Sequence, residues 1–201
     1  MLQSIWLIRH GETEWTQSGA HTGRTDIPLT ERGRWEAAAL ARLIAGRRFA
    51  KDLTSPMQRA RETCCLAGCG RAAQVDDNLR EWDYGDYEGI SSAEVRKKRP
   101  GWSLWMDGVP NGETVEQVGA RADAVIARAL SAGGEATNGE AADGDVALFA
   151  HGHLLRILTA RWLSLDADCG RLFALSTATV SRLGYEHETR VISQWNLSAW
   201  R

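Results

Sequence analysis

The chain alternates short apolar runs with longer segments in which apolar and polar residues are mixed. The runs at 5–8 (IWLI) and 146–150 (VALFA) are continuously apolar, which predicts strands that are buried on both faces of a sheet. Further short strands are predicted at 51–54, 74–75, 180–187 and 190–195. The last two form a predicted terminal β-hairpin, whose turn falls near Glu188 and Thr189.

The segments between these strands carry residues typical of helix starts and stops. Thr30 is a predicted N-cap, and Ser91 and Thr114 each precede by three residues the Glu or Gln that completes a capping box. Helices are predicted at 31–46, 56–68, 92–99, 115–130 and 154–163. Residues 79–89 and 133–144 are predicted loops. Because strands alternate with helices, the pattern predicts an α/β fold, a three-layer α/β/α sandwich with a mostly parallel central sheet.

Length and composition limit the class of protein. The 201 residues suit a single domain, and 43% hydrophobic with 25% charged residues is ordinary for a globular fold. A net charge of -2 argues against a nucleic-acid partner, because it provides no overall positive field. No apolar run approaches the length of a membrane span, and the N-terminus lacks the features of a signal peptide. The oligomeric state is not predicted from these quantities.

The cysteines favour a reducing compartment. Cys64, Cys65 and Cys69 lie in one predicted helical stretch, and Cys169 is far from them in the chain. This spacing fits neither a zinc site nor a set of dispersed disulfides, so we expect small buried thiols. A cytoplasmic location follows as the expectation.

Unusual polar residues follow several of the predicted strands. His10 and His151 each end an apolar strand and are each followed by glycine, and Arg9 precedes His10. Arg59 falls in the first turn of the helix that follows strand 51–54. Ligands of open α/β sheets bind outside the carboxyl ends of the strands, so we expect these four side chains to meet at one rim. Two cations beside two imidazoles predict an anion, and phosphate suits the arginine fork best.

Phosphoryl transfer needs a nucleophile, charge neutralisation and a proton for the leaving group. A neutral imidazole can attack phosphorus if an acceptor holds its other nitrogen, and the sequence does not reveal that acceptor. The acidic candidates in the loop 79–89 are Glu81, Asp83, Asp86 and Glu88, and the residues alone do not decide among them. No Gly-rich Walker loop is present, which argues against a nucleoside triphosphate substrate.

The segment Arg9-His10-Gly11-Glu12-Thr13 resembles the signature of the histidine phosphatase superfamily, the phosphoglycerate mutase-like group. The likeness continues, in the order found in that family, through 22–30, 55–60, 79–81, 85, 88–89, 111–114 and 151–153. The stretch 13–30 is similar to the sedoheptulose-1,7-bisphosphatase branch. One such block would be weak evidence, but ordered blocks across nearly the whole chain are specific. The resemblance implies a single histidine phosphatase domain over 1–201, with a helical or loop cover around 85–115.

The resemblance also implies a role for individual residues. His10 would be the nucleophile, and Arg9, Arg59 and His151 would bind the phosphoryl group. Glu81 would be the general acid and later the base, which resolves the choice left open above. Implied substrate-binding residues are Thr16, Thr22, Gly23 and Gly152. Thr16 departs from the Asn that many members carry, and its shorter side chain reaches less far toward a phosphate. No metal and no cofactor are implied.

The expected function is that of a metal-independent phosphomonoesterase. It would hydrolyse a small phosphorylated metabolite, a sugar phosphate or bisphosphate, through a phosphohistidine. The alternatives are a cofactor-dependent phosphoglycerate mutase, or a phosphatase acting on other phosphomonoesters. Mutases usually carry a longer insertion after the acid loop and an extra C-terminal tail, which this sequence lacks, so hydrolysis is favoured.

Two further alternatives come from other classes. A metallohydrolase using His151 and His153 is disfavoured, because the neighbouring arginines would repel a cation. His153 itself is expected to cap or pack at the helix start, and His21 to lie outside the reacting group's immediate contacts. A catalytically inactive binding module is disfavoured, because all the implied catalytic residues are present.

Overall fold

The computed structural model describes residues 4–71, 73–132 and 144–199. In these residues one six-stranded sheet has the order β3-β2-β4-β1-β5-β6. The strands are β1 (Ile5–Arg9), β2 (Lys51–Thr54), β3 (Gln74–Val75), β4 (Val146–Ala150), β5 (Val180–Glu186) and β6 (Thr189–Leu197). β1 to β4 run parallel to one another, whereas β5 and β6 are antiparallel. The predicted mostly parallel α/β sheet is confirmed.

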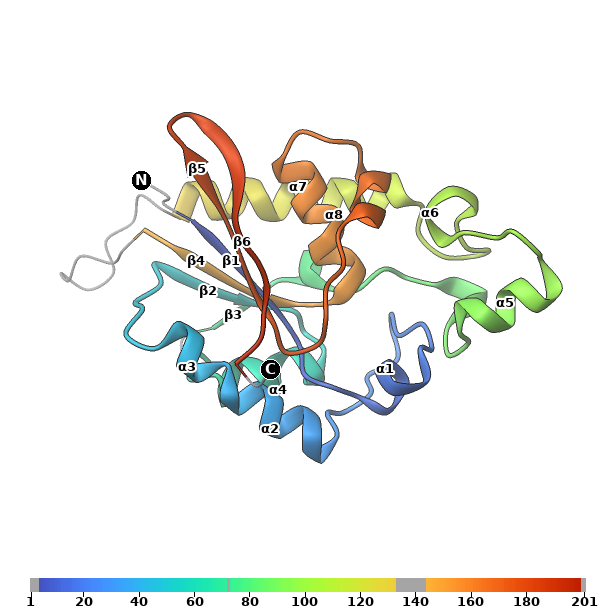
Figure 1. Ribbon diagram of the computed structural model, residues 1–201, viewed down its shortest axis with the longest axis horizontal. Helices are drawn as coiled ribbons and strands as arrows, with labels where there is room; N and C mark the ends of the chain where they lie inside the picture. Colours follow the sequence, from blue (N-terminus) through green and yellow to red (C-terminus); the bar gives the residue numbers. More distant parts are fainter. Residues whose placement is uncertain (1–3, 72, 133–143, 200–201) are drawn as a thin grey trace.

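Helices cover both faces of the sheet (Figure 1). They are α1 (Glu14–Ser18), α2 (Glu31–Ala39), α3 (Ala41–Ile44), α4 (Gln58–Leu66), α5 (Ser92–Lys98), α6 (Leu104–Asp107), α7 (Val115–Ala132) and α8 (Gly152–Trp162). The short 3-10 helices are η1 (Asp77–Leu79), η2 (Gly85–Tyr87) and η3 (Ala167–Leu172). α2, α3 and α4 lie below the sheet in this view, and α7 and α8 lie above it.

The alternation of side chains along β1 explains the three layers. Ile5 and Leu7 belong to the core between the sheet and helices α7 and α8. Trp6 and Ile8 belong to a second core, between the other face of the sheet and helices α2 to α4. Successive residues of a strand point to opposite faces, so an unbroken apolar run fits a strand that is covered on both sides. The strand β4 divides in the same way, with Leu148 on the first face and Phe149 on the second.

Close packing of two glycines fixes the loop that follows β1. A Cβ on Gly11 would lie 2.3 Å from the carbonyl oxygen of Gly33, and one on Gly33 would lie 2.1 Å from the carbonyl oxygen of Glu12. Thr30 caps α2 as predicted, with its hydroxyl accepting from the N–H of Gly33. The loop after His10 therefore rests on the start of α2, because neither glycine has room for a side chain.

Several element boundaries differ from the sequence prediction. The helix expected at 31–46 divides at Leu40, and α4 begins at Gln58 rather than at Pro56. Neither α1 nor α6 was predicted, because each is too short to show a periodic pattern. The hairpin turns at 187–188, one residue earlier than expected. The predicted loop at 133–144 lies outside the described residues except for its last residue.

The cysteines depart in part from the expectation of buried thiols. All four are free, but only Cys64 is buried, and Cys65 is exposed. No helix in the described part of the chain is long and apolar enough to cross a bilayer.

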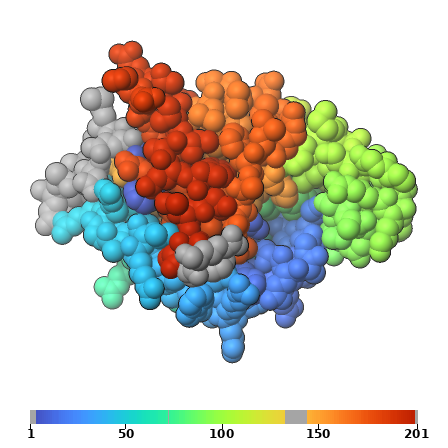
Figure 2. All heavy atoms as spheres, viewed as in Figure 1, coloured from blue at the N-terminus to red at the C-terminus, as the bar shows by residue number. Residues whose placement is uncertain are grey.

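Residues 85–115 lie at one end of the molecule, where Figure 2 shows them in green as a protruding lobe. α5 and α6 belong to this segment, and an isolated bridge joins Ser91 to Ala20 near α1. Trp102 is buried and packs edge to face on Tyr87. Trp105 packs edge to face on Trp82. Both tryptophans thus pack within the fold.

Candidate active site

The rim at the carboxyl ends of β1 and β4 brings two histidines together. His10 directly follows β1, and His151 directly follows β4. Their ring centroids lie 5.2 Å apart, with the planes at 62°. Arg59, in the first turn of α4, donates from Nε to His151 Nδ1 at 3.2 Å. The predicted meeting of strand ends is therefore observed, because β1, β4 and β2 are neighbours in the sheet.

The imidazole of His10 is held in one tautomer. Its Nδ1 lies 2.7 Å from the carbonyl oxygen of Gly11, which can only accept, so Nδ1 carries the proton and Nε2 keeps a lone pair. Burial lowers the pKa of His10 well below its usual range, and the charges of Arg59 and Arg9 lower it further. The acceptor that sequence reasoning could not identify is thus the adjoining backbone carbonyl.

His151 has the opposite tautomer. Its Nδ1 accepts from Arg59, so the Nε2 proton points to Ser55 Oγ at 2.8 Å. Burial first, and then Arg59 and His10, hold the pKa of His151 well below its usual range. Arg59 and His151 are both fully buried, and neither lines the cavity described below. Ser55 stands in the recognised Ser-Pro block, but its contact with His151 was not predicted.

Arg9 has an unsatisfied donor. Its Nη1 donates to the carbonyl oxygen of Leu175, while its Nε is buried and has no partner in the described residues. The guanidinium packs on the backbone of Gly152. Burial lowers the pKa of Arg9, but a guanidinium stays charged in proteins. A buried cation with a free N–H indicates a place for an anion.

A cavity of about 160 Å³ opens beside His10. The predicted site residues that line it are Arg9, His10, Thr16, Thr22, Glu81 and Gly152. Gly23 instead lines a second cavity of about 510 Å³, which shares Glu81 with the first. Gly23 has no room for a side chain, because a Cβ would lie 2.4 Å from the carbonyl oxygen of Trp82. Its role is therefore to let two loops pass closely.

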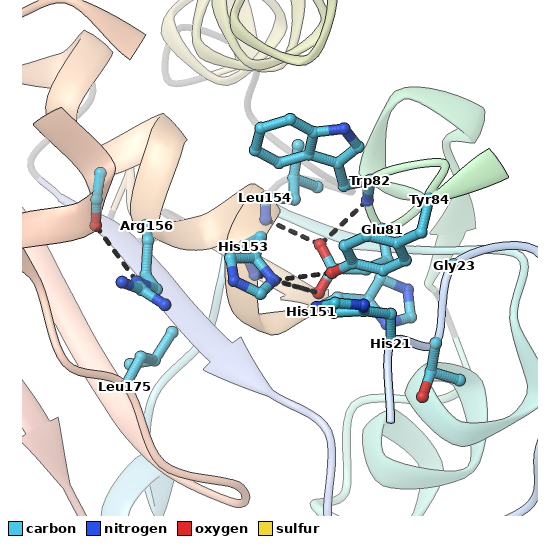
Figure 3. Close-up of polar contacts among 12 residues, drawn as sticks. His21, Gly23, Glu81, Trp82, Tyr84, His151, His153, Leu154, Arg156 and Leu175 are labelled. Atoms are coloured by element: carbon cyan, nitrogen blue, oxygen red, sulfur yellow. Dashed lines mark hydrogen bonds and ion pairs between the residues drawn. The ribbon is translucent and has the colours of Figure 1, made fainter. Parts of the chain in front are cut away.

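Glu81 is tied to the start of α8 (Figure 3). Its Oε1 accepts from the N–H groups of Trp82 at 3.0 Å and Leu154 at 2.9 Å, and its Oε2 accepts from the N–H of His153 at 3.0 Å. Side-chain burial is nearly complete, with 7% exposed. These bonds fix the carboxyl group, which lines the cavity beside His10.

The other three acids of this loop are engaged elsewhere. Asp83 pairs with Arg24, and Glu88 accepts from the N–H groups of Gly23 and Thr25. Asp86 accepts from the side chain of Asn111. Of the four acidic candidates left open by the sequence, only Glu81 lines the cavity beside His10.

The hydroxyl groups of Thr16 and Thr22 both donate hydrogen bonds to backbone carbonyls of the protein. Thr16 completes a capping box at the start of α1, accepting from the N–H of Thr13 and donating to its carbonyl. Thr22 donates to the carbonyl of Ala20. The shorter reach expected of Thr16 is thus accompanied by a local bond that already uses its proton.

Residues without an expected role in substrate binding also line this cavity: His21, Tyr84, His153 and Arg156. His153 Nδ1 lies 2.6 Å from the hydroxyl of Tyr84, and the ring of His21 stacks on Tyr84 with centroids 4.7 Å apart. Burial, and then Arg156, hold the pKa of His153 well below its usual range, so its ring is neutral beside the Tyr84 hydroxyl. Arg156 lies over the ring of Trp105 at 4.7 Å and donates to the carbonyl of Gly170.

A sequence pattern could have pointed to Arg156. It lies three residues after His153 in a predicted helix, and residues at that spacing share a helix face. His153 does not cap α8, because His151 is the N-cap, but it packs at the helix start as expected, with its ring against Trp82 and Trp105. In the described residues no group of three or more His, Cys, Asp or Glu is arranged to hold a metal ion.

Comparison with known proteins agrees with this geometry. The family model described as histidine phosphatase superfamily (branch 1) matches residues 5–198. The chain is 37% identical to an acid phosphatase of Mycobacterium tuberculosis over 96% of this chain and 92% of that protein. It is also 37% identical to sedoheptulose 1,7-bisphosphatase of Saccharomyces cerevisiae, over 81% and 68% respectively. A solved structure of a Mycobacterium tuberculosis open reading frame superposes with a TM-score of 0.88 at 35% identity, over 98% of both chains. The chain therefore belongs to branch 1 of the histidine phosphatase superfamily and is a phosphatase.

Proposed function

We propose that this phosphatase hydrolyses a small sugar phosphate or bisphosphate through a phosphohistidine at His10. One observation carries the proposal: the bond from His10 Nδ1 to the carbonyl of Gly11 leaves Nε2 unprotonated in a cavity walled by Arg9. A neutral imidazole with a fixed lone pair is a nucleophile, and a buried guanidinium neutralises the phosphoryl oxygens.

In the first step His10 Nε2 attacks phosphorus, the N–P bond forms and the bond to the leaving alcohol oxygen breaks. Glu81 gives its proton to that oxygen. Oε2 is the oxygen that would carry this proton, because it receives one backbone N–H while Oε1 receives two. In the second step the Glu81 carboxylate takes a proton from water, the water oxygen attacks phosphorus, and the N–P bond breaks.

Arg59 and His151 would support the same step although neither lines the cavity. The bonds of Arg59 to His151 and to the carbonyls of Thr22, Gly23 and Thr25 account for all but one of its N–H groups. The remaining Nη1 proton and the fixed charge would stabilise the negative phosphoryl oxygens. His151 would hold the Arg59 side chain in position, because Nδ1 of His151 accepts from Arg59 and Nε2 is bonded to Ser55.

Arg156 supports the proposed substrate class. It adds a second cation to the cavity wall, and the Tyr84-bound His153 stands beside it. A second anionic group on the substrate, such as the other phosphate of a bisphosphate, would meet this cation. One relative, sedoheptulose 1,7-bisphosphatase of Saccharomyces cerevisiae, acts on a substrate of this kind.

A phosphate-release screen tests the substrate. Sugar monophosphates, sugar bisphosphates, phosphoglycerates and nucleotides are ranked by kcat/KM for the native enzyme and for Arg156→Gln. We expect bisphosphates to rank first, and Arg156→Gln to lower their kcat/KM about tenfold more than that of the monophosphates. An equal loss on all substrates would remove Arg156 from substrate selection.

A trapping experiment tests the mechanism and the mutase alternative. Rapid quenching with radiolabelled substrate should give an acid-labile phosphoprotein that is absent from His10→Ala. Phosphate release is then compared with isomerisation of phosphoglycerate. Isomerisation faster than hydrolysis would make the enzyme a mutase.

A cytoplasmic location is proposed on the state of the cysteines. All four are free and Cys65 is exposed, which suits a reducing compartment. Cell fractionation tests this location, and recovery of the protein outside the cytoplasm would contradict it.

A further inference from the structure

The segment that carries Glu81 lies between η1 and η2 and belongs to no helix or strand. Its backbone is held by a side chain from another layer of the fold. Arg121 of α7 donates from Nη1 to the carbonyls of Asn78 at 2.9 Å and Arg80 at 2.8 Å. Its Nη2 donates to the carbonyl of Glu81 at 3.3 Å. One planar guanidinium thus binds three carbonyls of the acid-bearing segment.

Glu113 completes this arrangement. It accepts from Arg121 through both carboxylate oxygens, at 2.8 Å from Nε and 2.7 Å from Nη2. The same carboxylate accepts from the N–H of Asp83 at 2.9 Å, and the Glu113 carbonyl accepts from the indole of Trp82 at 2.8 Å. The two residues therefore hold the backbone on both sides of Glu81.

The Arg121–Glu113 pair does not line the cavity beside His10. It lines the second cavity, with side chains 18% and 22% exposed. The other two arginines of that cavity are matched by acids, Arg24 by Asp83 and Arg80 by Asp77. Because these cations are already paired, the second cavity does not concentrate positive charge for a ligand, and the contacts of Arg121 point to a role in Glu81 placement.

We propose that the Arg121–Glu113 pair is a positioning device for Glu81, and that it acts on proton transfer to the leaving group and not on attack by His10. The proposal rests on the proposed role of Glu81 as general acid. The side chain of Glu81 is tethered to α8 by the N–H groups of His153 and Leu154, so the backbone clamp from α7 supplies the second fixed point. A general acid must lie within hydrogen-bond reach of its target, and displacement by an ångström is costly.

Leaving groups of different basicity separate this role from a purely structural one. An alkyl phosphate releases a basic alkoxide that needs the proton, whereas p-nitrophenyl phosphate releases a weakly basic phenolate that does not. The measurement is kcat/KM for an alkyl phosphate and a series of substituted phenyl phosphates. This constant reports steps through loss of the leaving group, so hydrolysis of the phosphohistidine does not mask the effect.

For Arg121→Lys we expect kcat/KM to fall about 10- to 100-fold on the alkyl phosphate and less than about threefold on p-nitrophenyl phosphate. Lysine keeps the charge but cannot bind Glu113 and three carbonyls at once. Glu113→Gln keeps the shape of the side chain and should show the same larger loss of kcat/KM on the alkyl phosphate. It replaces Arg121→Lys in the experiment if that variant does not fold. A loss of equal size on all substrates would overturn the proposal.

Two controls complete the experiment. Arg161→Lys disrupts a bidentate ion pair between Arg161 of α8 and Asp123, which lies on α7 like Arg121. This variant should leave kcat/KM unchanged for every substrate. The double variant Glu81→Gln with Arg121→Lys should be no more selective than Glu81→Gln alone, because the clamp acts through Glu81. If Glu81→Gln is selective and Arg121→Lys is not, only the clamp is refuted. If Glu81→Gln itself shows no selectivity, the assignment of the general acid fails.

Discussion

The guanidinium of Arg9 lies directly against the backbone of Gly152, where a Cβ would stand 3.2 Å from Cζ and 3.3 Å from Nε. Gly152 is the first residue of α8, so the absence of its side chain lets β1 and α8 converge on the cavity. In this position Nη1 of Arg9 donates to the carbonyl of Leu175, while Nε has no partner in the described residues.

Replacing this glycine separates activity from stability. Gly152→Ala should displace the Arg9 guanidinium and weaken inorganic phosphate binding and kcat/KM about tenfold, because anion binding depends on its position. Alanine is a better helix former than glycine, so the melting temperature should stay constant or rise. Phosphate competition and thermal unfolding measure the two effects. Unchanged phosphate affinity would show that Arg9 tolerates the methyl group.

The hydroxyl of Ser55 accepts from Nε2 of His151, whose tautomer is set by the Arg59 N–H at Nδ1. Ser55→Ala leaves the buried Nε2–H of His151 without its 2.8 Å partner, which should cost about 1–3 kcal/mol of unfolding free energy. We also expect kcat to fall, because His151 no longer holds Arg59 in place. Ser181→Ala is the control: Ser181 is fully buried and accepts from the N–H of Asn196, away from the cavity. If both variants retain full activity per folded molecule, Ser55 has no part in catalysis.

Three buried imidazoles predict how stability depends on pH. The pKa values of His10, His151 and His153 all lie well below the usual range, chiefly because of burial. Below pH of about 6.5 the unfolded chain binds protons that the folded protein does not, so the unfolding free energy decreases as pH falls. The slope is at most about 1.4 kcal/mol per pH unit for each histidine. Urea unfolding at pH 5.5 and 7.5 measures it, and His153→Asn should reduce the slope.

The positions of the proposed reacting groups could be predicted from the sequence because they depend on the ends of strands. His10 and His151 each end a continuous apolar run, and parallel neighbouring strands bring such ends to one rim. Glu81 was placed by resemblance, since nothing in the loop itself distinguishes it from Asp83. In the structure the distinction is clear, because the start of α8 supplies two of its three N–H donors.

The rest depended on which partner each side chain finds in three dimensions. Thr16 was assigned to the substrate, yet its hydroxyl caps α1, a helix too short to leave a periodic pattern. Gly23 was assigned likewise, but it lines the neighbouring cavity. Arg156 was not assigned to the site, because it lies in α8, whose sequence is mostly apolar and typical of a buried helix. The local sequence pattern predicts helices and strands. Whether a polar side chain bonds to nearby backbone or is free to bind a ligand depends on how its surroundings pack in three dimensions.

A buried carboxyl in β2 gives a prediction far from the cavity. Asp52 lies opposite Ala147 of β4, and its Oδ1 is buried with no partner in the described residues. Burial raises its pKa to about 6, and burial followed by Asp52 raises the pKa of Cys69 to about 12. At this site the folded protein binds a proton more tightly than the unfolded chain, so the contribution of Asp52 to stability is greatest below pH 3.8 and is lost as pH rises through about 6.

Asp52→Asn should remove this cost, because the amide stays neutral at every pH. We expect the variant to gain up to about 2 kcal/mol of unfolding free energy at pH 8 and nothing at pH 4. Asp76→Asn is the matched comparison and should destabilise, because Asp76 pairs with Arg128 at 2.8 Å and accepts from the N–H of Asn78. Activity should remain unchanged in Asp52→Asn, since Asp52 does not line the cavity beside His10. A variant that is less stable than the native protein at pH 8 would mean that the hydrogen bond between the Asp52 carboxylate and the Cys69 thiol stabilises the fold by more than burial of the carboxylate costs.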